Sequence, residues 1–372
     1  MADIVFDPTG SPENFAAHLK ALSTKNASVL IFACDGNRFE KAILDPLLLE
    51  SSATVLGAVF PSIIYNARKY ERGTLFIALD DEMESRIIED ISKIDQDRLD
   101  ADMQEKSVGF DLSSNTMFLF IDGLAKNIGA CINALFDYHG PDINYIGGGS
   151  GSLSLEQKPS LFTNQGLLKD AFVYACSKRR SAIGVSHGWK SVSGPYQVTR
   201  SAPGIIRELD YRPAFEVYKD VVDGFSTEPI GKENFFSVAK SFPFGINRIS
   251  DEKVMRDLIV LDGTGMVCIG DVEEGSYVDI LQGSRDDLIE AARNAADVSH
   301  RKMDFENDFT LFIDCISRVL FLEEKFDSEI EAVYRNGTPL IGALTFGEIA
   351  NGGGGYLEFY NKTAVVGHIG HG

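Results

Sequence analysis

A glycine- and serine-rich segment offers the first candidate for binding chemistry. Residues 147–152 read Gly-Gly-Gly-Ser-Gly-Ser, and such small residues let several backbone N–H groups turn toward one anionic group. No lysine follows within the segment, so it is not the phosphate-binding loop of nucleotide hydrolases. The segment predicts either a ligand-binding nest made by Gly147, Gly148, Gly149 and Ser150, or a tight turn in which larger side chains would clash.

His187 is the first choice among the six histidines for contact with a ligand or with haem iron. It follows an apolar, strand-like run and stands beside Gly188 and Trp189, the only tryptophan of the chain, so Trp189 is a second candidate for ligand contact. His139, at the expected end of a helix, is the second choice for an axial ligand. No C-x-x-C-H sequence is present, so any haem b would be bound non-covalently. The alternative for His187 is a hydrogen-bonded core histidine.

Arg318 offers a clamp for a carboxylate. Cys315 and Arg318 are three residues apart, which places them on one face of a helix, and an arginine can hold a carboxylate through two parallel hydrogen bonds. Thr345 and Glu348, in a later glycine-containing turn, can complete a polar ligand pocket. The alternative for Arg318 is an ion pair with Asp314 or Glu348.

Acyl or amide hydrolysis is the rival activity, with Ser150 or Cys315 as nucleophile. The sequence has no G-x-S-x-G nucleophile elbow. We therefore expect a binding protein without catalytic residues, and a ligand-free interaction scaffold is a further alternative.

The composition narrows the classes of partner. The 372 residues carry a formal net charge of −20, with 44% hydrophobic and 24% charged residues, which is typical of a globular protein. That charge repels nucleic acid and anionic membrane surfaces. The N-terminus has no signal-peptide pattern, and the apolar runs are too short to span a bilayer. Five scattered cysteines without a C-x-x-C pair predict reduced thiols in a cytoplasmic protein.

An internal repeat must position these residues. Three apolar, strand-like runs each end at an aspartate and precede a helix-like stretch: residues 29–35, 117–122 and 309–314. After each helix comes a strand-like segment with a glycine-rich turn, at 56–62, 146–152 and 341–347. A further β-rich run follows each time, at 74–79, 170–175 and 363–368. The pattern strand, helix, strand, glycine turn, strand predicts an α/β fold of two related lobes with mixed, largely antiparallel sheets packed with helices. Coincidental α/β patterning is the alternative.

Capping signals locate the helices. Ser11 and Pro12 predict a helix over 12–23, and Ser284 with its acidic first turn predicts one over 284–298. The helices inside the repeat are expected at 123–138 and 315–330. The turn-rich stretch at 221–233 is the best candidate boundary between lobes.

An ordered series of short motifs resembles the FIST family. The part that resembles the family's N-terminal domain has His187-Gly-Trp189, Tyr196-Gln-Val-Thr199, Glu208-Leu-Asp210 and Pro213-Ala-Phe-Glu-Val-Tyr218. The C-terminal half has Asp314-Cys315-x-x-Arg318, Gly347-Glu348-Ile349 and Phe359-Tyr-Asn361-Lys-Thr363. The resemblance implies an N-terminal helical extension at 1–26, a FIST N-type domain at 27–222 and a FIST C-type domain at 223–372. The turn at 56–62 lacks the Gly-Glu pair, so we expect that it has lost any ligand role.

The resemblance also implies a function. FIST proteins are sensory input modules for small molecules such as amino acids, and free-standing bacterial members similar in length to this chain are haem-binding nitric oxide sensors that regulate a partner histidine kinase. We therefore expect a cytoplasmic small-ligand sensor in signal transduction, whose ligand is haem and nitric oxide or an amino-acid-like molecule. Its output partner would be a histidine kinase or another signalling protein.

Overall fold

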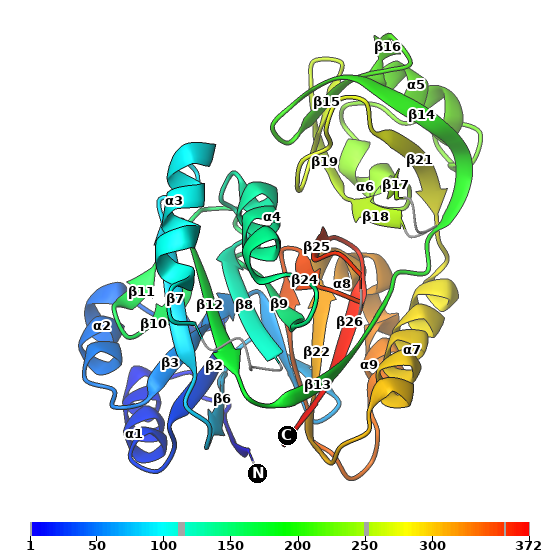
Figure 1. The fold of residues 1–372 in the computed structure, drawn as a ribbon. Coiled ribbons are helices and arrows are strands. Elements are labelled where there is room, and N and C mark those ends of the chain that lie inside the picture. The colour runs from blue at the N-terminus through cyan, green and yellow to red at the C-terminus, as the bar shows by residue number, and fades with distance from the viewer. Residues whose placement is uncertain (1, 111–115, 249–252, 353–354, 372) are drawn as a thin grey trace.

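The protein consists of a larger and a smaller lobe (Figure 1). The structure is a computed structural model that describes residues 2–110, 116–248, 253–352 and 355–371. Strand pairs β2–β3, β8–β9 and β22–β23 are parallel, and the other pairs of the described chain are antiparallel. The predicted fold class, α/β with two lobes of mixed, largely antiparallel sheets packed with helices, is confirmed, but the repeat that was expected to make the lobes related lies within the larger lobe.

The larger lobe contains three consecutive units with the same order of elements. The first unit comprises β1 (Asp3–Asp7), α1 (Pro12–Ser23), β2 (Ser28–Cys34), η1 (Asp35–Asn37), α2 (Lys41–Leu49), β3 (Thr54–Phe60), β4 (Ser62–Tyr65), β5 (Arg68–Tyr70) and β6 (Thr74–Leu79). The second comprises β7 (Glu84–Glu89), α3 (Gln96–Ser107), β8 (Thr116–Asp122), α4 (Ile128–His139), β9 (Asn144–Ser150), β10 (Leu161–Thr163), β11 (Gly166–Leu168) and β12 (Ala171–Ser177). The third comprises β13 (Arg180–Ser186), α7 (Arg285–Lys302), β22 (Asn307–Cys315), α8 (Ile316–Leu322), η2 (Glu323–Lys325), α9 (Phe326–Val333), β23 (Leu340–Thr345), β24 (Glu348–Ala350), β25 (Glu358–Tyr360) and β26 (Ala364–Gly370).

The smaller lobe is inserted into the third unit between β13 and α7. Its elements are β14 (Lys190–Ala202), β15 (Ile205–Leu209), β16 (Arg212–Pro213), α5 (Ala214–Val222), α6 (Phe235–Ala239), β17 (Phe244–Asn247), β18 (Lys253–Arg256), β19 (Leu258–Asp262), β20 (Gly265–Cys268) and β21 (Tyr277–Gln282). The predicted boundary stretch at 221–233 begins at the end of α5, inside this lobe. The division of the chain at residues 222 and 223 stays a prediction.

The three units exchange hairpins around a ring. Their sheets have the strand orders β1-β6-β2-β3-β10-β11, β7-β12-β8-β9-β24-β25 and β13-β26-β22-β23-β4-β5. In each sheet, the last two strands are a hairpin supplied by another unit. The predicted repeat of strand, helix, strand and strand is therefore confirmed, and it relates three units within the larger lobe.

The first glycine of each predicted glycine-rich turn lies within a strand, whereas Gly347 of the third segment lies between β23 and β24 with φ of 97°. Gly57, Gly147 and Gly342 stand in β3, β9 and β23. A Cβ on any of them would lie 1.7–2.1 Å from the carbonyl oxygen of its register partner on the parallel strand, so no side chain fits there. These glycines mark equivalent positions in the three units.

Two helix predictions based on capping are confirmed. Ser11 accepts a hydrogen bond from the Asn14 N–H at the start of α1, and Ser284 forms a capping box with Asp287 at the start of α7. The predicted helix over 315–330 is instead two helices, α8 and α9, because the chain turns at Glu323, where φ is 54°. The N-terminal segment contains the predicted helix and also β1, which pairs with β6.

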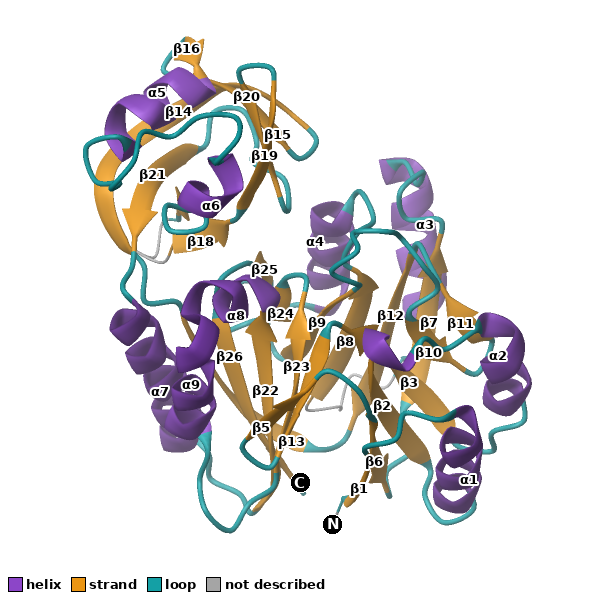
Figure 2. Ribbon diagram, turned by 180° about the vertical axis from the view of Figure 1, so that it is seen from behind, coloured by secondary structure: helices purple, strands orange, loops and turns teal. Residues whose placement is uncertain are grey.

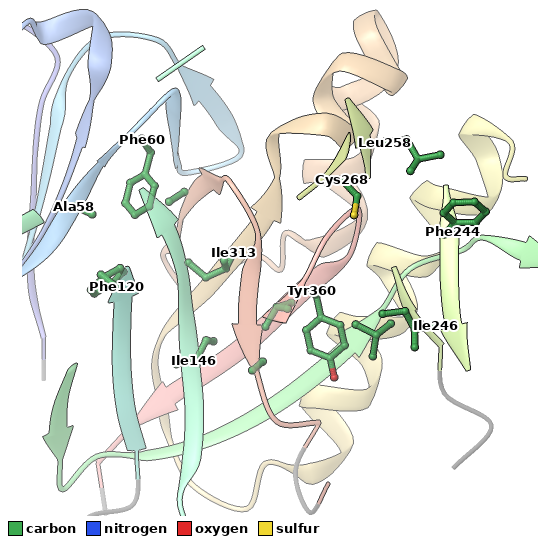
Figure 3. Close-up of a cluster of buried hydrophobic side chains, with 14 of the residues drawn as sticks. Ala58, Phe60, Phe120, Ile146, Phe244, Ile246, Leu258, Cys268, Ile313 and Tyr360 are labelled. Atoms are coloured by element: carbon green, nitrogen blue, oxygen red, sulfur yellow. The ribbon is translucent and has the colours of Figure 1, made fainter. Parts of the chain in front are cut away.

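The sheets pack against one another inside the larger lobe, and the helices cover their outer faces (Figure 2). One buried apolar cluster joins Phe60, Phe120 and Ile313 of the three units. It continues into the smaller lobe, and Figure 3 shows Tyr360 of β25 next to Ile246 of β17 at this passage. None of the described helices combines the length and the hydropathy that a membrane span requires.

Candidate functional site

Arg318 lies in a buried polar cluster of the third unit. α8 begins directly after β22, which brings Arg318 one helical turn beyond Asp314, and Arg318 Nε lies 3.0 Å from Asp314 Oδ1. The same Nε donates to Glu329 Oε1 of α9 at 3.0 Å. All three side chains are fully buried. The ion pair with Asp314, which the sequence left as the alternative, is therefore present.

The other donors of Arg318 are also engaged. Nη1 donates to the carbonyl oxygens of His187 and Lys362 at 2.9 and 3.2 Å, and Nη2 donates to that of Leu288 at 2.8 Å. All three nitrogens thus have partners within the protein. A carboxylate ligand could bind Arg318 only after some of these hydrogen bonds had broken.

Glu348 and Thr345 belong to the same buried cluster, as the sequence predicts. Thr345 Oγ1 donates to Glu348 Oε1 at 2.9 Å, and the Thr363 N–H donates to Oε2 at 3.2 Å. Burial raises the pKa of Glu348 to about 8, because the ionised carboxylate loses its water. The two side chains are fully buried, so they stabilise a closed core.

The glycine-rich segment is part of the neighbouring sheet. Gly147, Gly148 and Gly149 lie in β9 and pair with β24, and the Gly149 N–H already donates to the Gly347 carbonyl at 2.8 Å. The predicted nest or turn is therefore a strand. Ser150 is also buried, and its hydroxyl lies 2.7 Å from that of Ser160.

His187 and Trp189 pack over the Arg318 cluster. The Trp189 N–H donates to His187 Nδ1 at 2.9 Å, and Trp189 Nε1 donates to the Lys362 carbonyl at 3.1 Å. Burial, aided by the Arg318 charge, lowers the pKa of His187 to about 4, so the ring is neutral at pH 7. Because Nδ1 accepts a hydrogen bond, the neutral ring carries its proton on Nε2.

His139 lies elsewhere, at the end of α4. Its Nε2 is 3.2 Å from the Ser107 hydroxyl, and its ring packs against Phe110 and Tyr174. Nδ1 is sealed from solvent. As arranged, neither His139 nor His187 presents an unprotonated, accessible ring nitrogen to haem iron. The described chain also has no group of three or more His, Cys, Asp or Glu side chains placed to hold a metal ion.

Two clefts of the described chain have volumes in the range of small-molecule sites. One, of about 740 Å³, lies between the first and second units and is lined by residues that include Asp35, Arg38, Gly151, Ser152 and Ser160. We call it the unit cleft. The other, of about 660 Å³, is lined by α4 and β25 of the larger lobe and by the smaller lobe, and we call it the interlobe cleft.

An inserted loop opens the unit cleft. The Val59 N–H donates to the Ser160 carbonyl at 2.7 Å, and the Gly151 N–H donates to the Val59 carbonyl at 3.1 Å. Between Gly151 and Ser160, residues 152–159 form a loop outside regular structure. This loop supplies part of the cleft wall.

The corresponding junction between the second and third units is closed. There, Gly149 makes the same two hydrogen bonds, donating to Gly347 O at 2.8 Å and accepting from Phe346 N at 2.9 Å. Phe346 and Gly347 are consecutive, so no loop is inserted. The Phe346 side chain is 3% exposed and packs where a Cβ on Gly123 or Gly151 would lie. The unit cleft is therefore a local departure from the repeat.

Opposite charges line the unit cleft. Asp35 accepts a hydrogen bond from the Ser152 hydroxyl through Oδ2 at 2.7 Å. Arg38 is exposed at the end of η1 and pairs with no carboxylate of the described residues. Beneath them, Asp122 is 1% exposed, and burial raises its pKa from the usual value. The sequence marked Asp35, Asp122 and Ser152 through the repeat, but nothing in it singled out Arg38.

The comparisons with known proteins identify both halves of the chain. The model of the FIST N domain matches residues 27–212 and that of the FIST C domain matches residues 214–351. No curated protein matches the sequence. Among solved structures, the chain is similar to a crystal structure of a chorismatase with a TM-score of 0.33 and 9% identity, over 99% of this chain and 98% of that one. A likeness at that TM-score carries no argument about activity.

Proposed function

Because the chain belongs to the FIST family, we propose that it is a cytoplasmic sensor that binds an amino-acid-like ligand in the unit cleft. FIST domains are small-ligand sensing domains of signal transduction. The observation that carries the proposal is the presence of an unpaired guanidinium and a carboxylate, those of Arg38 and Asp35, on the wall of one cleft.

The cleft matches the chemistry of an amino acid. Its volume of about 740 Å³ lies in the range typical of small-molecule sites. Arg38 can hold the carboxylate of the ligand through two hydrogen bonds, and Asp35 can accept a hydrogen bond from its ammonium group. Val59 and Leu124, which also line the cleft, offer apolar contact to the ligand side chain.

The position of the cleft supports a signalling mechanism. Asp35 and Arg38 belong to the first unit, whereas Ser152 and the loop 152–159 belong to the second. A ligand that contacts both units shifts the population toward the arrangement that binds it better. A separate output protein, such as a histidine kinase, would read that arrangement.

Thermal stability in the presence of free amino acids tests the proposal. A ligand at 100 times its Kd stabilises the folded protein by about 2.7 kcal/mol, so at least one amino acid should raise the Tm of the wild type. Arg38→Ala and Asp35→Asn should abolish that shift, and Arg98→Ala, at an exposed site on α3 outside the cleft, should retain it. A folded wild type that responds to none of the twenty amino acids would sink the proposal.

We further propose that the chain is not a hydrolase. Burial raises the pKa of the Cys315 thiol well above its usual value, which suppresses the thiolate that a cysteine nucleophile needs. Ser150 is buried against Ser160, and no histidine of the described chain bonds its hydroxyl. Steady turnover of an activated ester, lost in Ser150→Ala or Cys315→Ala, would reverse this conclusion.

Haem remains the second ligand that the family resemblance predicts. Expression with a haem supply and an absorbance spectrum test it directly. A stoichiometric Soret band that disappears in His187→Ala or His139→Ala would support haem binding, and the absence of uptake would remove it.

A further inference from the structure

Arg256 is a buried arginine without a carboxylate partner. The residue ends β18 and is 6% exposed. Its Nε donates to the Asp271 carbonyl at 3.0 Å, and its Nη1 donates to the carbonyls of Met255 and Phe359 at 2.9 and 2.8 Å. Within the described part of the chain, no carboxylate forms an ion pair with it. Burial lowers the pKa of the Arg256 guanidinium from its usual value, but an arginine stays protonated in a protein.

The free edge of Arg256 faces the interlobe cleft. Nη2 makes no hydrogen bond to any described residue, yet it is not among the unpartnered atoms that are sealed from solvent. Arg256 lines the interlobe cleft, so Nη2 opens there. A buried charge without a counterion is unfavourable unless something else neutralises it. The arrangement therefore presents a preformed donor to an anion that enters the cleft.

The acidic side chains near Arg256 have other partners. Arg248 holds Glu358 through two hydrogen bonds, Nε to Oε1 at 2.9 Å and Nη2 to Oε2 at 3.0 Å. Asp271 accepts the Gly204 N–H at 2.8 Å, and its other oxygen lies near Gly129 in the first turn of α4. Asp271 thereby offsets the positive end of that helix. Among the described residues that line the cleft, the guanidinium of Arg256 is left as the cation without an ion pair.

The remaining cleft residues limit the charge of the ligand. Asp137 and Glu273 also line the cleft, so its wall carries more acidic than basic side chains. A phosphate or a dicarboxylate would bring a second negative charge close to these groups and be repelled. A single carboxylate matches the one unpaired guanidinium and, with one negative charge, meets less of that repulsion.

A ligand in this cleft would contact both lobes. The larger lobe contributes α4 and β25, and the smaller lobe contributes β17 and β18 together with the loops around Pro203 and Val272. Figures 1 and 2 show the smaller lobe above β25 and beside α4. An occupant would therefore link the lobes through contacts that the protein alone lacks.

We propose that Arg256 binds the carboxylate of a small monocarboxylate in the interlobe cleft, at a second site separate from the unit cleft. The site is independent of the proposed amino-acid site, because the two clefts share none of the residues that line them. Occupation stabilises the contact between the lobes.

Titration with simple anions at constant ionic strength tests the proposal. Acetate or propionate should raise the Tm and give saturable heat in calorimetry, whereas chloride, phosphate and succinate should give weaker binding or none. Arg256→Gln should lose at least tenfold in affinity for acetate, and Arg256→Lys should retain part of it. Arg207→Gln, which removes a guanidinium of the smaller lobe that pairs with Asp262 outside the interlobe cleft, is the matched control and should bind acetate to within about twofold of the wild type.

Three outcomes would overturn the proposal: an equal response to acetate and chloride, tighter binding of phosphate, or acetate binding that persists when Arg256→Gln is combined with Arg38→Ala. Should Arg256→Gln fail to fold, modification of the wild type by phenylglyoxal decides the question. Acetate must then protect residue 256 in the peptide map, and unprotected modification contradicts the site. Arg38→Ala and Asp35→Asn should leave the acetate response unchanged, so failure of the amino-acid site can be told apart from failure of this one.

Discussion

The buried arginines Arg318 and Arg256 both donate to backbone carbonyl oxygens, but they differ in whether a carboxylate pairs with the guanidinium. Each donates to three backbone carbonyl oxygens. Arg318 also pairs with the carboxylates of Asp314 and Glu329, whereas no described carboxylate pairs with Arg256. Burial of a charge therefore does not identify a ligand site by itself. The absence of a counterion beside a cleft is what distinguishes Arg256.

The same substitution at both arginines should have unequal effects on stability. Arg318→Met leaves two buried carboxyl groups without their cation, and such a loss typically costs about 3–5 kcal/mol. Arg256→Met leaves only carbonyl oxygens without donors, at about 1–3 kcal/mol. Urea unfolding of the two variants measures the difference. Equal losses of stability would contradict the view that Arg318 neutralises buried carboxylates and Arg256 does not.

The pH dependence of stability should show that Glu348, a carboxyl group of the Arg318 cluster, is protonated in the folded protein. Burial raises the folded-state pKa of Glu348 to about 8, so the folded protein holds a proton that the unfolded chain releases above its ordinary pKa of about 4.3. Stability is then fully present at low pH and falls as the pH rises toward 8, by up to about 1.4 kcal/mol for each pH unit.

Glu348→Gln should flatten this slope, because the amide keeps the hydrogen-bonding shape and cannot ionise. The measurement is the free energy of unfolding of wild type and variant from pH 5 to 9. Parallel curves for the two proteins would show that Glu348 does not hold the proton.

The sequence predicted those features that depend on local chemistry. Ser11 and Ser284 marked helix starts because capping is a contact over three residues. The repeat was visible because buried strands and close-packed glycines constrain residue type in each unit. The glycine-rich segment was misread as a turn because close approach of a parallel strand selects glycine as strongly as a turn does, as the contact of Gly147 with Leu119 shows.

The candidate sites depended on contacts that sequence spacing does not encode. Arg318 stood in a recognisable motif, and its ion pair with Asp314 spans one helical turn. Its second carboxylate, Glu329, comes from another helix. Arg256 and Arg38 belong to no recognisable motif. What distinguishes each of them is the absence of a carboxylate partner among the described residues, which only the structure shows. The sequence did not reveal the unit cleft either. The loop 152–159, which supplies part of its wall, can be recognised as an insertion only after the structure has defined the repeated unit.

The smallest expected effect concerns the cysteines beside the two arginines. Cys315 lies in the Arg318 cluster, and Cys268 lies close enough to Arg256 for their charges to interact. Burial raises the pKa of Cys268 to about 12 even though the positive charge of Arg256 opposes the rise, and it raises the pKa of Cys315 well above its usual value. Neither thiol should form the thiolate that reacts with alkylating reagents at pH 7.5.

The native protein should therefore show almost no iodoacetamide labelling at either site over minutes, and both should label fully after unfolding. Selective labelling of native Cys268 would contradict this expectation. It would show that the positive charge of Arg256 lowers the pKa of the Cys268 thiol by more than burial raises it.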